Sequence, residues 1–111
     1  MDILETREGA VTVMKPCGPL LLAEAEQFKT RFVEVLPRCL GRVVVDATAI
    51  AYVDSRGLEV LVELGEEMAQ AGQTLKLCGA NETLREVMDL TETLGHFEQF
   101  ADVHTAVRSF L

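Results

Sequence analysis

The chain has 111 residues, of which 49% are hydrophobic and 25% are charged, a composition typical of a folded globular domain. Its length suits one domain, spanning residues 1–111, and is too short for two. Acidic residues outnumber basic residues by 18 to 10, giving a net charge of −8, so contact with nucleic-acid phosphates would be repulsive and nucleic acid is not an expected partner.

The first part of the chain predicts two strands and a helix. Residues 3–8 and 11–17 are typical of strands on either side of a turn. Between about residues 21 and 36, apolar side chains recur at the spacing of one helix face; they are Leu21, Ala25, Phe28, Phe32 and Val35. We expect Pro37 and Gly41 to end this helix.

The middle of the chain predicts a βαβ unit. Residues 42–48 contain three consecutive valines, which suits a strand covered on both faces in a parallel sheet. A second amphipathic helix begins after Asp54 and ends near Gly72, a residue suited to a left-handed helix end. Residues 74–78 then form a short alternating strand.

The last part predicts two helices around a short strand. Asn81 is a candidate N-cap for a helix that Gly95 ends, residues 97–100 form the strand, and Asp102 caps a closing helix. The whole chain is expected to be one α/β domain with a mixed sheet of four to five strands and about four helices packed mainly on one face.

The sequence shows no pattern of a membrane segment or an export signal. Its apolar runs are far shorter than the roughly 18 residues of a membrane-spanning helix, and the first residues are acidic and polar. We therefore expect a cytoplasmic protein without direct membrane insertion. Cys17, Cys39 and Cys78 are odd in number and far apart, which predicts reduced thiols rather than disulfides or a metal site.

The sequence VDSRG, between the middle strand and the second helix, is the most informative local feature. With Asp54 as N-cap, Val53 and Leu58 occupy the two positions of a hydrophobic staple, which the alternative N-cap, Ser55, would not allow. Asp54 is thus predicted to accept a backbone N–H, and Ser55 to place its hydroxyl in solvent at the first helical position. Gly57 lacks a side chain, so another backbone segment could approach closely there.

Residues 43–58, VVVDATAIAYVDSRGL, resemble the signature of the STAS family, the bacterial anti-sigma factor antagonists. The order of predicted elements is similar to that of such domains across essentially the whole chain. The resemblance implies a STAS-like fold in which Ser55 is phosphorylated by an anti-sigma factor serine kinase and dephosphorylated by a PP2C-type phosphatase. The family often has Ser or Thr where this chain has Arg56.

The resemblance implies a protein-interaction switch, which binds a kinase-type anti-sigma factor while Ser55 is unphosphorylated. A phosphate adds roughly −1.5 to −2 charge, which a helix N-terminus tolerates but a partner with acidic or apolar groups does not. Arg56 could offset part of this charge by pairing with the phosphate. The predicted contact residues lie where the ends of parallel strands converge; they are Asp46, Tyr52, Asp54, Ser55, Arg56 and Gly57, beside Asn81.

Patterns typical of enzymes are missing. Val53 stands where a G-x-S-x-G nucleophile elbow requires glycine, and no glycines have phosphate-loop spacing. Asp46 suits a turn better than a paired catalytic carboxylate, and His96 and His104 suit solvated positions. We expect neither catalysis nor a cofactor.

Two further hypotheses remain. STAS-like domains also bind the cytoplasmic side of lipid transporters and form the tails of anion transporters. As an accessory subunit, this chain would dock on a transporter ATPase, with Ser55 as an interface residue. A bound nucleotide or fatty acid has only the polar strand ends in its favour.

Overall fold

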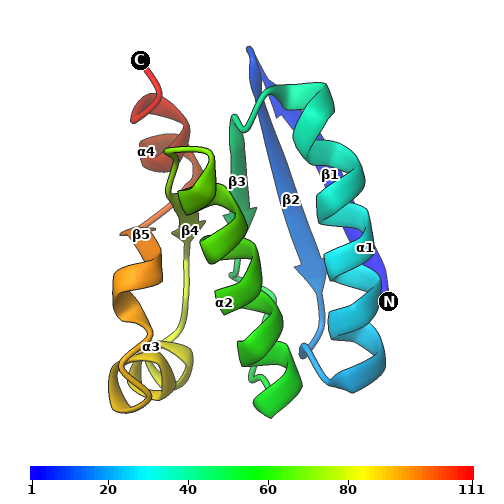
Figure 1. The fold of residues 1–111 in the computed structure, drawn as a ribbon, viewed down its shortest axis with the longest axis vertical. Helices are drawn as coiled ribbons and strands as arrows, with labels where there is room; N and C mark the ends of the chain where they lie inside the picture. The colour runs from blue at the N-terminus through cyan, green and yellow to red at the C-terminus, as the bar shows by residue number, and fades with distance from the viewer.

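A five-stranded mixed sheet forms the centre of the computed structural model, which describes residues 1–111 (Figure 1). The strand order follows the chain, and only the first pair of strands is antiparallel. The strands are β1 (Asp2–Glu8), β2 (Val11–Cys17), β3 (Val43–Asp46), β4 (Leu75–Cys78) and β5 (Phe97–Phe100). This arrangement confirms the predicted mixed sheet and the βαβ unit.

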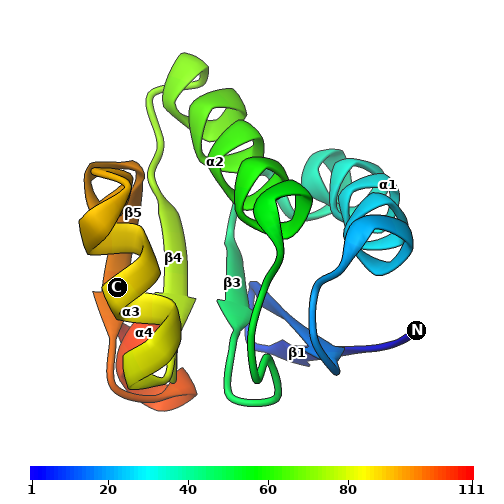
Figure 2. The ribbon, with the colours of Figure 1, turned by 90° about the horizontal axis from the view of Figure 1, so that it is seen from below.

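Three of the four α-helices pack on one face of the sheet. α1 (Leu22–Cys39) and α2 (Ser55–Gln70) lie side by side on that face (Figure 2), and α3 (Glu82–Leu90) contributes to the same hydrophobic cluster. The short α4 (Val103–Arg108) packs on the opposite face. None of these helices combines the length and apolar character needed to cross a membrane.

The valine run of β3 divides its side chains between the two faces, as a period of two residues requires. Val43 and Val45 are buried in the larger cluster with Phe28 of α1, whereas Val44 packs in the smaller cluster with Ala106 of α4. The prediction of a strand covered on both faces is confirmed.

Two predicted helix ends differ from the structure. α1 continues past Pro37 to Cys39 and ends at Leu40, whose φ of 54° is left-handed. Proline lacks a backbone N–H, but near the end of a helix the loss of one hydrogen bond does not stop the last turn. Gly95 does not end α3, because α3 ends at Leu90 and Gly95 lies in a later 3₁₀ turn.

Candidate functional site

Three loops converge at the carboxyl ends of β2, β3 and β4, and backbone hydrogen bonds join the first two. The Gly18 N–H donates to the Ala49 carbonyl, and the Leu20 N–H donates to the Tyr52 carbonyl, both at 3.2 Å. The Asp54 N–H donates to the Leu20 carbonyl, also at 3.2 Å. The start of α2 is thereby fixed to the segment that leads into α1.

The Asp54 carboxylate caps two helices at once. Its Oδ1 accepts the Gly57 N–H at 2.7 Å within α2, which confirms the predicted N-cap. Its Oδ2 accepts the N–H of Leu22, the first residue of α1, at 3.0 Å. Leu21, the N-cap of α1, offers no capping side chain, so α1 depends on a carboxylate that lies 32 residues later in the chain.

Gly57 allows the close approach that the sequence predicted, and the approaching segment is Leu20. A Cβ at position 57 would lie 2.1 Å from the Leu20 carbonyl oxygen, which is closer than atoms can pack. This carbonyl accepts the Asp54 N–H, so it cannot move away without breaking the junction of the two helices.

Asn81 ties the third loop to the same place. Its Oδ1 accepts the Leu84 N–H at 2.8 Å and caps α3, as predicted. Its Nδ2 donates to the carbonyls of Ala51, at 3.0 Å, and Ile50, at 3.3 Å. The loop that precedes Ser55 is therefore held from both sides.

Asp46 fixes the beginning of this loop. It is only 8% exposed, and its Oδ1 accepts the Thr48 N–H at 3.0 Å and the Thr48 hydroxyl at 2.7 Å. Asp46 and the buried Gly57 were predicted as contact residues, but both lie beneath the surface. They shape the surface and offer a partner little exposed area.

Ser55 begins α2 with an exposed side chain whose hydroxyl makes no hydrogen bond within the chain. Two large apolar side chains nearby are also exposed, Tyr52 at 52% and Leu22 at 62%. We call Leu22, Tyr52 and Ser55 the Ser55 surface. Leu22 could not be predicted from the sequence, because its proximity to Ser55 depends on the long-range hydrogen bond with Asp54.

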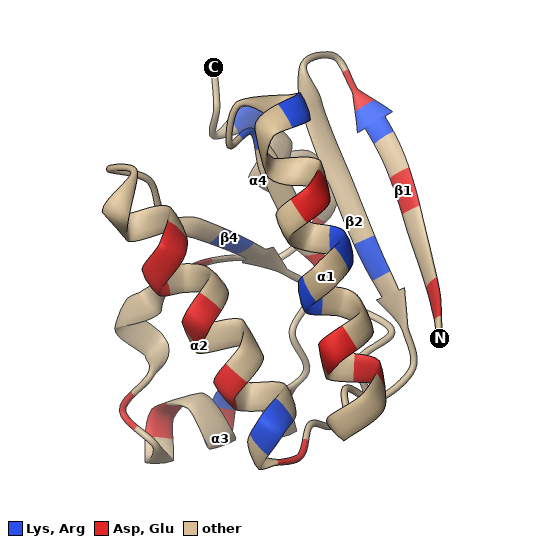
Figure 3. Cartoon of the chain, turned by 45° about the vertical axis from the view of Figure 1, so that its right-hand side comes forward, with Lys and Arg blue, Asp and Glu red and all other residues tan.

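Arg56 is held by carboxylates of both helices. Its guanidinium pairs with Glu26 of α1 and with Glu59 and Glu63 of α2, and Lys29 of α1 pairs with Glu63 at 3.4 Å. Figure 3 shows acidic and basic residues along both helices. The guanidinium therefore joins α1 to α2, and it would have to leave its carboxylates to reach a phosphate on Ser55.

The pKa values of this cluster are displaced by hydrogen bonding. The Arg56 guanidinium lowers the pKa of Glu26 and of Glu63 below the ordinary value of 4.5. In return, hydrogen bonds to the carboxylates raise the pKa of Arg56. The charges of Arg56, Glu26 and Glu63 are therefore all present at neutral pH.

Neither histidine lies in the three loops. His96 belongs to the 3₁₀ turn before β5, and His104 is an exposed residue of α4.

The three cysteines are free, and burial raises the pKa of Cys78 to about 12. At neutral pH this thiol is uncharged and therefore a poor nucleophile.

The family model of the STAS domain matches residues 3–106 of this chain. No curated protein matches it in sequence. Among solved structures, it is similar to a candidate anti-sigma factor antagonist of Thermotoga maritima, with 20% identity and a TM-score of 0.86 over 96% of this chain and 92% of the other.

Two further similar structures belong to different kinds of protein, a bacterial cell fate determinant and a mammalian anion transporter. One is the Bacillus cell fate determinant SpoIIAA in its phosphorylated form, with 14% identity and a TM-score of 0.73 over 99% of this chain and 100% of the other. The other is the murine Solute Carrier 26 family member A9 anion transporter, with 17% identity and a TM-score of 0.76 over 95% of this chain and 18% of the transporter. At these identities the similarity concerns the fold.

We predict that Asp54→Ala destabilises the protein more than the loss of an ordinary cap does. One N-cap contributes about 0.5–2 kcal/mol, and Asp54 serves two helices. Asp102→Ala is the matched control, because Asp102 caps α4 alone through the Thr105 N–H. Urea unfolding should show a larger loss of unfolding free energy for Asp54→Ala, and equal losses would contradict the double cap.

We also predict that Arg56→Gln reduces the acid sensitivity of the fold. Glu26 and Glu63 have lowered pKa values in the folded state. Their contribution to stability is therefore complete above about pH 4.5, the pKa in the unfolded chain. It is lost as the pH falls through the lowered pKa values of the folded state. Carbon-13 NMR titration should show both pKa values rising in the variant. Asp102, whose low pKa depends on the Thr105 N–H, should not change; unaltered Glu26 and Glu63 would contradict the cluster.

Proposed function

The chain belongs to the STAS domain family, and on that premise we propose that it is a protein-interaction switch of the anti-sigma factor antagonist type, controlled by phosphorylation of Ser55. The exposed Ser55 hydroxyl, free of hydrogen bonds on a firmly held helix end, is the observation that carries the proposal. A kinase can reach such a hydroxyl without unfolding its surroundings.

The start of α2 has room for a phosphate. The N–H groups of Ser55 and Arg56 have no acceptor within the chain, because the Asp54 carboxylate accepts the Gly57 N–H and the Asp54 carbonyl accepts the Leu58 N–H. Free N–H groups and the helix dipole stabilise an anion at this end. The fold therefore survives phosphorylation, and the added charge changes the affinity of a partner that binds the Ser55 surface.

Binding in the unphosphorylated state uses the apolar side chains of the Ser55 surface. Exposed Leu22 and Tyr52 offer contact area beside a neutral hydroxyl. A phosphate would place a strongly hydrated charge in the middle of that area and next to Asp54. A partner with apolar or acidic groups there would lose affinity, since like charges at an interface cost several kcal/mol.

In this proposal the partner is an anti-sigma factor serine kinase, and a PP2C-type phosphatase restores the hydroxyl. The protein is then a substrate of catalysis rather than a catalyst, and it acts in the cytoplasm. The similarity in fold to SpoIIAA, whose matched structure is a phosphorylated form, supports the assignment. Neither histidine is placed to act as a base on Ser55.

A second candidate function is that of an accessory module of a membrane transporter, favoured by the similarity to part of an anion transporter. In that case Ser55 is an interface residue without a phosphate. Purification of the protein from its native cells separates the two functions. A phosphate on Ser55 in peptide mass spectra and a co-purified kinase support the switch, whereas unmodified Ser55 with a transporter ATPase supports the module.

We predict that Ser55→Ala binds the recovered kinase whether or not ATP is supplied, and that Ser55→Glu lowers its affinity by about tenfold or more. Both variants should melt like the wild type, because the helix end tolerates either side chain. Thr74→Glu is the matched control, since it adds the same charge before β4, at the other end of the sheet. Equal affinity of all variants, measured by calorimetry, would disprove the switch.

We predict that Leu22→Ser and Tyr52→Ser each weaken kinase binding by about tenfold, which is the effect of an apolar interface anchor. Their exposed side chains contribute little to folding, so thermal melting should be unchanged. Leu90→Ser is the control, because Leu90 is 83% exposed at the end of α3. If Leu90→Ser weakens binding as much, the contact surface lies elsewhere.

A further inference from the structure

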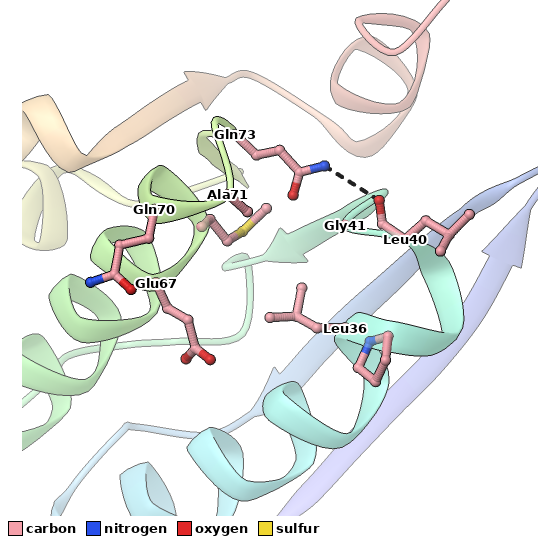
Figure 4. Close-up of a pocket in the computed structure, with 9 residues that line it drawn as sticks. Leu36, Leu40, Gly41, Glu67, Gln70, Ala71 and Gln73 are labelled. Atoms are coloured by element: carbon pink, nitrogen blue, oxygen red, sulfur yellow. Dashed lines mark hydrogen bonds between the residues drawn. The ribbon is translucent and has the colours of Figure 1, made fainter.

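A groove of about 560 Å³ lies between the carboxyl ends of α1 and α2. It is at the far end of this helix pair from Ser55, the first residue of α2. Figure 4 shows the groove with α1 on one side and α2 on the other. We call it the carboxyl-end groove; its lining includes Leu36, Leu40, Glu67 and Gln73.

Leu40 is held at the groove in an unfavourable conformation. Its φ of 54° is in the left-handed region, where glycine is preferred, and its side chain is 74% exposed. Its N–H donates to the Leu36 carbonyl, and its own carbonyl accepts the Gln73 side-chain amide at 3.3 Å. Leu40 is not buried in this chain, so core packing does not explain why a leucine occupies a strained position. Such strain is typical of functional sites.

The groove is also electronegative. No lysine or arginine lines it, and Glu67, unlike Glu63 on the preceding turn, forms no ion pair. α2 has no basic residue in its last turn. α1 has Arg38 in its last turn, but Arg38 does not line the groove and donates to the Glu34 carbonyl. The partial negative charges at the carboxyl ends of both helices meet here, since α1 and α2 each follow a strand of the parallel part of the sheet and run in the same direction.

We propose that the carboxyl-end groove docks a segment of a partner protein that presents a lysine or arginine between apolar side chains. The positive charge lies against Glu67 and the helix ends, and the apolar side chains cover Leu36 and Leu40. A protein segment fits better than a small molecule, because small-molecule pockets enclose most of their ligand, whereas Leu40 stands out in solvent. The chain thus has a second interaction surface, separate from the Ser55 surface.

The test uses the full chain and a short amidated helical peptide with one lysine between two leucines. In nitrogen-15 spectra, the peptide should shift the amides of residues 36–41 and 67–73. Replacing its lysine by glutamine should weaken binding by about fivefold at low salt, the effect of one exposed ion pair. The variant Glu67→Gln should weaken the lysine peptide to the same extent and leave the glutamine peptide unaffected.

Matched variants distinguish the groove from general attraction to an acidic protein. Glu66→Gln removes the same charge from the adjacent exposed residue, which does not line the groove, and should bind like the wild type. Leu40→Gly should weaken binding of both peptides without lowering the melting temperature, because glycine accepts a positive φ. Ser55→Glu should bind the peptide normally, so the result does not depend on the proposed phosphorylation.

Three outcomes would overturn the proposal. The first is the absence of shifts at residues 36–41 and 67–73 at millimolar peptide. The second is equal weakening by Glu66→Gln and Glu67→Gln, which would indicate non-specific electrostatics. The third is tighter binding of an alkylammonium ion than of the lysine peptide, which would indicate a small-molecule site.

Discussion

The Asp54 carboxylate is the constraint on which the Ser55 surface depends. One oxygen accepts an N–H at the start of α2, and the other accepts an N–H at the start of α1. Because the Leu20 carbonyl also accepts the Asp54 N–H and lies against Gly57, the two helix starts form one rigid junction. Loss of the carboxylate would release the start of α1 and the exposed Leu22 together.

A rigid junction suits a switch that works by charge. Hydrogen bonds from Asn81 and to Asp46 hold the loop before Ser55. Arg56 joins α1 to α2 through ion pairs with three carboxylates. In the proposed switch, the free N–H groups at the start of α2 donate hydrogen bonds to a phosphate on Ser55 without rearrangement of the backbone. The proposed phosphorylation would then change the electrostatics of the surface while its shape is kept, so affinity could change without a cost in folding.

The elements and the local caps were predictable because their signals are short-range. The valine run of β3 and the caps Asp54, Asn81 and Asp102 follow from residue type and spacing over a few positions. The second role of Asp54 was not predictable, because its acceptor and donor are 32 residues apart. The carboxylates around Arg56 were missed for the same reason, since Glu26 meets Arg56 only after α1 and α2 have packed.

The parallel course of α1 and α2 gives the helix pair two electrically different ends. At the amino end the two dipoles present positive charge, and the protein supplies its own anion, Asp54, between them. At the carboxyl end the dipoles present negative charge, but Glu67 adds to it and no cation of this chain lines the groove. The amino end is therefore neutralised within the chain and carries the proposed phosphorylation site, Ser55. The carboxyl end keeps a negative potential in the groove, which the proposed basic partner segment would neutralise.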